Sequence, residues 1–150
     1  MNIVQRIDQY DCRNIYFCDP IKNNIMNEGN FIRIIYSTQD VALNGVYLLI
    51  TLTDLVCEKY YNKYKCTFNV NNHRELIENI RIIEEDILKK IEIKNKCPLF
   101  KIYEQLSNGN IKIFNEITTR HNNSFILKIS GIWETQNNYG VTYKFIKINN

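Results

Sequence analysis

Three stretches in the first half of the chain are rich in β-branched and aromatic residues, and the third also alternates apolar and polar residues, which is typical of β-strands. They run from Phe31 to Thr38, from Val46 to Thr53 and from Tyr64 to Val70. A turn ending at Asn44-Gly45 separates the first two, so we expect these two strands to pair with each other. The sequence therefore predicts three strands before residue 72.

The hydrophobic period changes to 3.6 residues between positions 73 and 92, which predicts an amphipathic helix. Asn72 stands where a helix N-cap is expected, and Glu75 stands where a capping-box carboxylate would reach back. We expect the apolar stripe to pack into the core, because a stripe reserved for a partner would leave the sheet uncovered. Its members recur at intervals of three and four residues: Leu76, Ile80, Ile83, Ile87 and Ile91.

After Cys97-Pro98 the chain returns to patterns that are typical of strands. We expect strands over residues 99–106 and 111–114, joined as a hairpin because Asn108-Gly109 is a strong turn signal. The polar stretch 115–123 is expected to be an exposed loop.

The end of the chain contains two runs rich in β-branched and aromatic residues, 124–135 and 141–148. Asn138 and Gly140 lie between the two runs and tolerate positive φ, so we expect an antiparallel hairpin. The single tryptophan, Trp133, lies where the first strand of this hairpin is expected to bend.

The order of these elements predicts one α+β domain over residues 1–150. Its sheet is expected to be antiparallel, or to form an OB-like, partly closed barrel with one long helix between the third and fourth principal strands. Residues 1–30 are expected to be a flanking segment with a short strand at residues 15–18. Strands at 31–70, the helix at 72–92 and strands at 99–148 complete the domain.

Composition narrows the class of protein. With 45% hydrophobic residues, the chain is not disordered, and no apolar run approaches the length of about 18 residues that a membrane helix needs. The N-terminus lacks the pattern of a secretory signal, so we expect an intracellular protein that does not enter membranes. The five cysteines are odd in number and form no Cys-x-x-Cys pair, so we expect reduced core cysteines without a disulfide framework or a zinc site.

The sequence contains no recognisable catalytic motif, such as a Gly-x-Ser-x-Gly elbow, a Walker A loop or a His-Glu-x-x-His pair. We expect His73 and His121 to be solvated and Glu84-Glu85-Asp86 to form a solvated helix face. The prediction is therefore a non-enzyme without metal or cofactor. An enzyme that gathers residues from distant positions is the least favoured alternative.

Charge and aromatic residues instead favour binding. The net charge is +3, and residues 96–150 carry seven basic and three acidic side chains. Cations along a groove and rings for stacking are the requirements of single-strand nucleic-acid binding. Strand alternation places Lys128 and Lys144 on the face opposite their apolar neighbours, whereas Tyr143 is expected in the core. The candidate binding residues are Arg33, Tyr36, Tyr47, Lys63, Lys65, Lys112, Lys128, Trp133, Tyr139 and Lys144.

Two segments of the sequence resemble those of a known group of proteins. Leu-Lys-Ile-Ser-Gly-Ile-Trp-Glu-Thr at 127–135 is followed by Tyr-Gly-Val-Thr-Tyr-Lys-Phe at 139–145. Asn-Phe-Ile-Arg-Ile-Ile-Tyr-Ser-Thr at 30–38 is followed by Leu-Asn-Gly-Val-Tyr at 43–47. These segments, which with their surroundings cover about half of the chain, resemble small OB-fold-like single-strand DNA-binding proteins encoded by large DNA viruses.

The resemblance implies sequence-tolerant binding of single-stranded DNA in a viral replication or recombination system. It also implies a homo-oligomer or a replication protein as a further partner, and a location in the host cytoplasm, viral factory, nucleus or virion. The alternative is a viral structural or protein-interaction module, such as a virion component or an adaptor, which does not bind nucleic acid. That alternative predicts an exposed aromatic patch without flanking lysines.

Overall fold

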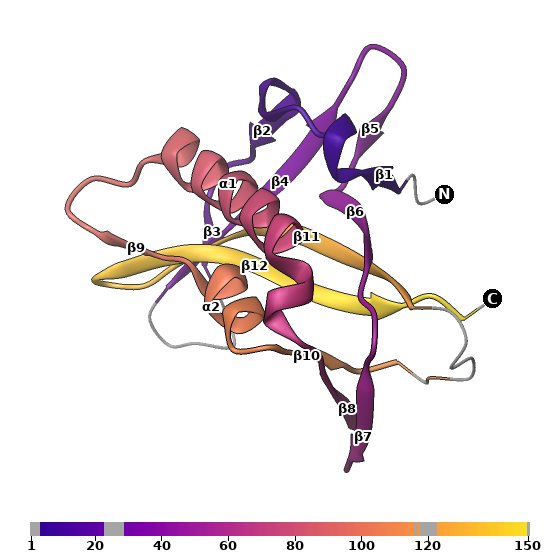
Figure 1. Ribbon diagram of the computed structural model, residues 1–150. Helices are drawn as coiled ribbons and strands as arrows, with labels where there is room; N and C mark the ends of the chain where they lie inside the picture. Colours follow the sequence, from indigo (N-terminus) through magenta and orange to yellow (C-terminus); the bar gives the residue numbers. More distant parts are fainter. Residues whose placement is uncertain (1–3, 23–28, 116, 118–122, 150) are drawn as a thin grey trace.

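A long β-hairpin forms the centre of the fold (Figure 1). The computed structural model describes residues 4–22, 29–115, 117 and 123–149. The predicted closing hairpin is confirmed: β11 (Ser124–Glu134) pairs antiparallel with β12 (Asn138–Lys147), from Phe125 opposite Lys147 to Glu134 opposite Tyr139. Asn138 and Gly140 lie within β12 and not in the turn, so that part of the prediction is wrong. A bulge between Ile129 and Gly131 bends β11, as the sequence predicts. Gly131 is needed there because a Cβ would collide with the Ile32 carbonyl oxygen and with the ring of Phe31.

Further strands extend the hairpin on both sides into one mixed, open sheet that does not close into a barrel. The sheet runs in the order β1-β6-β11-β12-β10-β8-β7. The pairs β1–β6, β10–β12 and β9–β12 are parallel, so the expectation of a purely antiparallel sheet is wrong. The bounds of the added strands are β1 Gln5–Arg6, β6 Val46–Thr51, β7 Val56–Tyr60, β8 Lys63–Thr67, β9 Cys97–Leu99 and β10 Asn110–Ile113.

The strand at residues 31–38 is confirmed as β4 (Asn30–Ser37), but its predicted partner is wrong. Instead of pairing with each other, β4 and β6 share one edge of the long strand β11. Residues 124–129 of β11 pair with β6, and residues 131–134, beyond the bulge, pair with β4. The other neighbours of β4 are the short strands β2 (Ile15–Phe17), β3 (Ile21–Lys22) and β5 (Ala42–Leu43). The short strand expected at 15–18 is therefore present as β2.

The predicted helix is confirmed as α1 (Arg74–Ile91). The expected cap at Asn72 is wrong, because Asn72 lies within a 3-10 turn, η3 (Val70–His73), which immediately precedes α1. Asn69 caps that turn, and its side chain accepts a hydrogen bond of 2.9 Å from the Asn71 backbone N–H. The third strand, β8, is correspondingly shorter than the predicted 64–70.

The strand predicted at 99–106 is wrong, because this segment forms the short helix α2 (Lys101–Ser107) after β9. Ile102 and Leu106 are both fully buried, and their spacing of four places them on one helical face. Gly109 has a φ of 75° and donates its N–H to the Leu106 carbonyl, so it ends a helix instead of closing a hairpin. The strand at 111–114 is confirmed as β10, but it starts from the end of this helix.

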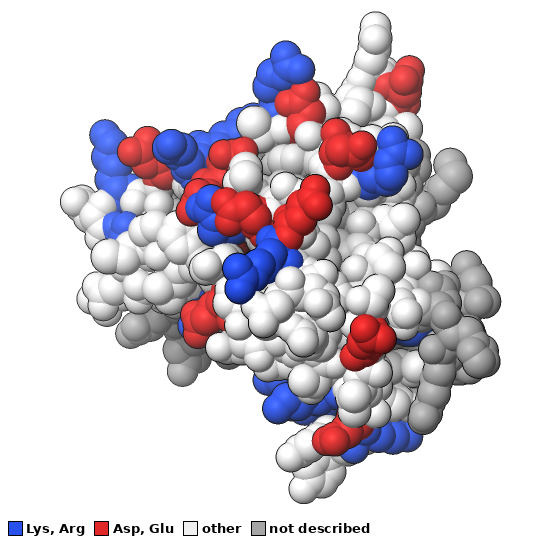
Figure 2. All heavy atoms as spheres, viewed as in Figure 1, with Lys and Arg blue, Asp and Glu red and all other residues white. Residues whose placement is uncertain are grey.

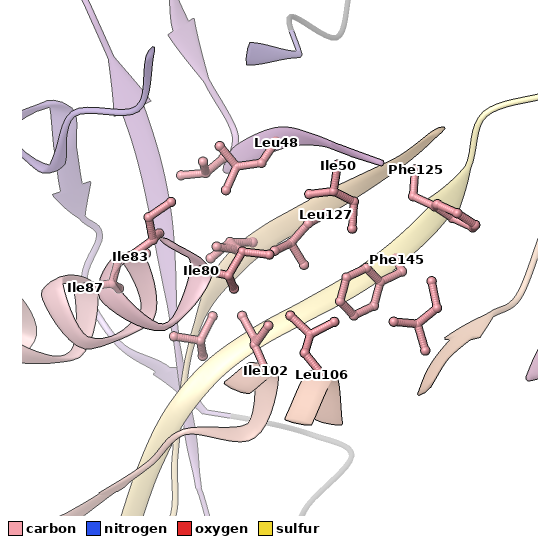
Figure 3. Close-up of a cluster of buried hydrophobic side chains, with 14 of the residues drawn as sticks. Leu48, Ile50, Ile80, Ile83, Ile87, Ile102, Leu106, Phe125, Leu127 and Phe145 are labelled. Atoms are coloured by element: carbon pink, nitrogen blue, oxygen red, sulfur yellow. The ribbon is translucent and has the colours of Figure 1, made fainter. Parts of the chain in front are cut away.

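The core lies between the sheet and the two helices, as Figure 3 shows. Ile80, Ile83 and Ile87 of α1 point toward the sheet, which confirms that the apolar stripe is core. Each isoleucine buried in this way contributes about 1.5–3 kcal/mol. The face of the sheet that contacts α1 and α2 is called the inner face here, and its buried residues include Leu48, Ile50, Leu127, Phe125 and Phe145.

Two segments of the chain project from this body or flank it. The hairpin of β7 and β8 extends away from the helices at the bottom of Figure 1. The N-terminal segment contributes two 3-10 turns, η1 (Ile7–Gln9) and η2 (Cys12–Asn14), beside β1 and β2. Of the five cysteines Cys66 is buried, whereas Cys97 is exposed and the others are partly exposed, so the expectation of core cysteines holds for Cys66 alone. Most of the loop expected at 115–123 lies outside the described residues.

Candidate nucleic-acid interface

A row of four lysines crosses four adjacent strands on the outer face of the sheet, opposite α1 and α2. Residues directly opposite each other in a sheet point to the same face. Lys128 of β11 lies opposite Lys144 of β12, and Lys112 of β10 lies opposite Lys65 of β8. The two pairs are themselves neighbours, because β10 and β12 run in parallel with Ile113 beside Phe145. Lys65, Lys112, Lys128 and Lys144 together are called the lysine row.

The alternation of each strand accounts for this placement. Each lysine of the row is flanked by residues whose side chains are buried or partly buried on the inner face, such as Leu127 and Ile129 beside Lys128. Lys65, Lys112 and Lys144 are exposed, and Lys128 is partly exposed. Among the described residues, no salt bridge involves any lysine of the row. Like charges directly opposite each other in a sheet are destabilising, and Glu58 of β7, which lies directly opposite Lys65, offsets this effect only at one end of the row.

Tyr47 and Lys63 lie next to the two ends of the lysine row. Tyr47 of β6 lies opposite Lys128, and the Lys128 Nζ is 5.5 Å from the centre of the tyrosine ring. This cation–π contact holds the ammonium group over the sheet. Lys63 lies two residues before Lys65 on β8 and therefore shares its face. Tyr47 itself is almost buried, so it supports Lys128 more than it offers a surface for a ligand.

Trp133 and Phe31 lie on the same outer face, beyond the bulge of β11. Trp133 pairs with Phe31 of β4 on one side and with Gly140 of β12 on the other. A Cβ at Gly140 would be 2.6 Å from Trp133 Cζ2, so the indole covers this glycine, and it remains partly exposed. Arg33 lies opposite Gly131 and is exposed beside these rings. Rings and cations therefore share the outer face.

The rings lie at some distance from the lysine row. Gly140, which Trp133 covers, is four residues before Lys144 on β12, which corresponds to about 13 Å at about 3.3 Å per residue. Trp133 therefore shares one face with Lys128 and Lys144 but is not their direct neighbour in the sheet. Phe31 was missed as a candidate. The alternation that places Arg33 outward also places Phe31 outward, so the sequence pattern alone could have identified Phe31 as a candidate.

A groove lies next to the centre of the row. It has a volume of about 510 Å³ and runs between α2 and strands β10 and β12. Lys112 and Lys144 line it together with Lys101, Phe114 and Tyr143. Phe114 is 61% exposed, whereas Tyr143 is partly buried and its hydroxyl donates to Gln105 Oε1 at 2.6 Å. Burial raises the pKa of Tyr143 to about 12, so this ring is neutral.

Two of the predicted binding residues lie in the core and are removed from the candidate surface. Tyr36 is 4% exposed, stacks on Tyr10 and accepts a hydrogen bond of 3.1 Å from the Asp11 N–H. Tyr139 is 5% exposed and lies on the inner face near Leu88 of α1. Both face inward because strand alternation gives them the same parity as buried neighbours.

The acidic residue Glu84 is fully buried, so the expectation of a solvated face is wrong for this residue. Its two carboxylate oxygens accept hydrogen bonds from the backbone N–H groups of Ile102 and Tyr103, at 3.0 and 2.9 Å. These are among the first N–H groups of α2, which have no partner within the helix. Burial raises the pKa of Glu84, while the two hydrogen bonds act in the opposite direction. Glu84 therefore joins α2 to α1 and has a structural role.

His73 is also buried, contrary to the expectation of a solvated side chain. Its Nε2 accepts a hydrogen bond of 2.9 Å from the Thr53 N–H, and its Nδ1 lies 2.7 Å from the Asn69 carbonyl oxygen. Because a backbone N–H can only donate, this arrangement fixes the neutral tautomer with its proton on Nδ1. His121 lies outside the described residues. In the part of the chain that the structure describes, no three His, Cys, Asp or Glu side chains gather as a metal site would require.

The opposite side of the molecule has a different distribution of charge. Figure 2 shows the side on which α1 lies, and acidic and basic groups are intermixed over it. Arg81 of α1, for example, forms ion pairs with Glu78 and Glu85. Because acidic and basic groups pair with each other here, the net electrostatic field on this side is small, unlike that over the lysine row.

The chain matches no known family model, and comparison with curated proteins and with solved structures also found no match. Among the described residues, no helix combines the length and the apolar content needed to cross a membrane.

Proposed function

We propose that the protein binds single-stranded nucleic acid, and single-stranded DNA in particular, along the outer face of its sheet. The observation that carries the proposal is the lysine row: four cations from four adjacent strands, without salt bridges to the described residues. A polyanion would relieve the repulsion between Lys128 and Lys144 and between Lys65 and Lys112. Binding of phosphates by such a row is independent of sequence.

The dimensions of the outer face suit a short single strand. Four neighbouring strands are separated by three spacings of about 4.8 Å, so the row extends over about 14 Å. Trp133 and Phe31 add stacking surfaces on the same face, and unpaired bases stack on aromatic rings whatever their identity. In this proposal the lysine row holds the phosphates and the rings beyond the bulge hold bases. The protein has no catalytic role and needs no cofactor or metal.

The biological setting of this activity follows from the resemblance in the closing hairpin and in β4. We place the protein in a viral replication or recombination system, inside the host cell, in its cytoplasm, nucleus or viral factory.

Titration of labelled oligonucleotides, followed by fluorescence anisotropy, tests the proposal. We expect binding of oligothymidine at low salt, weaker binding of a duplex of the same length, and similar affinities for single strands of different sequence. Duplex binding that equals or exceeds single-strand binding would contradict the proposal, as would the absence of any binding at low salt.

A second candidate function is that of a protein-interaction module, such as a virion component or an adaptor. The observation that favours it is the edge strand β7, whose hairpin with β8 presents Tyr61, 93% exposed, beside the exposed Tyr60. Val56, at the other end of β7, is also exposed. An unpaired edge strand with exposed apolar groups can add a strand from another chain. Sedimentation of the wild type and of a Tyr60→Ser/Tyr61→Ser variant tests this alternative. It expects an oligomer that the variant loses, together with no affinity for oligothymidine.

A further inference from the structure

Two cysteines face each other in the projecting hairpin. Cys57 of β7 lies directly opposite Cys66 of β8, and their Sγ atoms are 2.6 Å apart. Both residues are free thiols in the structure. The odd number of cysteines and the lack of close sequence motifs gave no indication of this pair, because antiparallel pairing brings together residues that are nine positions apart.

The backbone at this position accepts a disulfide without rearrangement. Directly opposite residues of an antiparallel pair have Cα atoms about 4.5–5.5 Å apart, depending on their place in the ladder. The Cα separation in disulfides ranges from about 4.4 to 6.8 Å, so either kind of opposite pair falls within it. The two strands would therefore keep their register when the sulfur atoms bond.

The two thiols differ in their access to reagents. Cys66 is fully buried, and burial raises the pKa of its thiol, whereas Cys57 is partly exposed. Lys147 of β12 supplies a cation whose field reaches both sulfur atoms. Its ammonium group donates to the Ile148 carbonyl at 2.7 Å and lies 5.4 Å from the centre of the Phe125 ring. The thiolate is the reactive form in disulfide exchange. At Cys66 the cation acts against burial, which remains the larger effect and raises the pKa of the thiol.

We propose that Cys57 and Cys66 form a reversible dithiol–disulfide pair that is oxidised by small disulfides of the glutathione class. The Cys57 thiolate attacks one sulfur of glutathione disulfide, forms a mixed disulfide and releases one glutathione thiolate. The Cys66 thiolate then attacks the Cys57 sulfur, closes the Cys57–Cys66 bond and releases the second glutathione. The pair loses two electrons, which reduce the glutathione disulfide, and the two thiol protons end on the two released glutathiones.

The bond would fasten β7 to β8 at the edge of the sheet. β7 has one neighbour in the sheet, so the hairpin depends on the pairing of β7 with β8. The hairpin also carries Lys63 and Lys65, and oxidation would hold them in place on the outer face. The inference about the thiols does not depend on nucleic-acid binding and has a separate test.

A full-length variant that keeps only these two cysteines gives the sharpest test. In Cys12→Ser/Cys18→Ser/Cys97→Ser, all three replaced thiols are at least partly exposed, so the core is unchanged. The folded variant is incubated at a series of glutathione-to-glutathione-disulfide ratios and then quenched with an alkylating reagent in denaturant, so that the buried Cys66 is also reached. The intact protein and its peptides are analysed by mass spectrometry. We expect loss of both alkylatable thiols, a mass lower by two hydrogen atoms, a cross-linked peptide that joins positions 57 and 66, and full reversal by excess glutathione.

Adding Cys57→Ser to the same background provides the control. We expect no glutathione adduct on this variant, because the remaining Cys66 is buried. The proposal is overturned if the two-cysteine variant keeps two alkylatable thiols at every ratio. It is equally overturned if glutathione adducts accumulate without a cross-link.

Discussion

At the scale of single residues, Trp133 is the side chain whose role is easiest to measure. Its indole rests on Gly140 and pairs with Phe31, so one surface of the ring is packed while the residue stays partly exposed. This combination suits a stacking platform, because a ring that is held in place loses little further freedom when a base stacks on it.

We expect Trp133→Ala to weaken binding of single strands by about 1–3 kcal/mol, since one stacked base is lost. Its cost in the free energy of unfolding should stay below the roughly 3–5 kcal/mol of a fully buried tryptophan, because the ring is partly exposed. Anisotropy titration and urea unfolding measure the two quantities. Trp133→Phe keeps a ring and should keep most of the affinity.

In the wild type, oligothymidine should quench the fluorescence emission of Trp133, the single tryptophan. Emission that does not change on adding DNA would show that Trp133 is not part of the binding site.

Gly131 and Gly140 make a matched pair of residues for a test of the hairpin. An added Cβ meets the Ile32 carbonyl oxygen at Gly131, whereas at Gly140 it meets the indole of Trp133. The carbonyl oxygen of Ile32 is held in a paired strand and cannot move away from an added Cβ, whereas the partly exposed indole of Trp133 can. We therefore expect each substitution to destabilise the protein by about 1–3 kcal/mol, and Gly131→Ala to cost more than Gly140→Ala. Equal midpoints of urea unfolding for the two variants would contradict this account of the bend.

At the scale of elements, the link between the two helices depends on Glu84. Its carboxylate satisfies two backbone N–H groups at the start of α2, a helix of seven residues that cannot be stable alone. We expect Glu84→Gln to lower the free energy of unfolding by about 1–3 kcal/mol, because the amide NH₂ cannot accept the hydrogen bond that one oxygen accepts now. Urea unfolding of the two proteins measures the difference. Glu75→Gln, an exposed change in the first turn of α1, is the control and should have little effect.

The same carboxyl group predicts a dependence on pH. Burial raises the pKa of Glu84 in the folded protein, so the folded state binds this proton more tightly than the unfolded state does. The resulting stabilisation is complete below the unfolded pKa and is lost as the pH rises through the folded pKa. We therefore expect the stability difference between wild type and Glu84→Gln to grow as the pH is lowered toward the usual carboxyl range. A difference that shrinks over that range would show that the folded pKa is not raised.

The elements also show what the sequence could predict. The closing hairpin and α1 were predictable because their patterns are long and local. The segment 99–106 was misread because Phe100, Ile102 and Tyr103 fit a strand as well as a helix, and the cap that favours the helix comes from Glu84 in another element. The strand β7 was missed because Cys57, Glu58 and Lys59 show no apolar alternation.

The candidate site was predictable in part for the same reason. Alternation alone places Lys128 and Lys144 outward. The row itself depends on β10 pairing in parallel with β12 and antiparallel with β8, and no local pattern specifies those neighbours. The buried positions of Tyr36 and Tyr139 likewise depend on how distant elements cover the inner face.

At the scale of the whole molecule, the charge is small in total but uneven in its distribution. The net charge is +3, and the α1 side carries intermixed acidic and basic groups while the lysine row lies on the outer face. We therefore expect polyanions to be attracted to the outer face and not to the α1 side. The affinity of the protein for them should depend strongly on salt and on a few lysines.

The salt dependence of single-strand binding tests this central claim most directly. If the four lysines of the row neutralise about four phosphates, log affinity for oligothymidine should fall against log salt with a slope of roughly −2.8, at about −0.7 for each phosphate. Lys112→Gln/Lys144→Gln should reduce the size of this slope by about 1.4 and weaken binding. Lys89→Gln/Lys94→Gln removes two exposed lysines at and just beyond the end of α1, so it changes the net charge equally and should leave the slope unchanged. Equal slopes for the two double variants would contradict the assignment of the outer face, and so would a wild-type affinity that does not respond to salt.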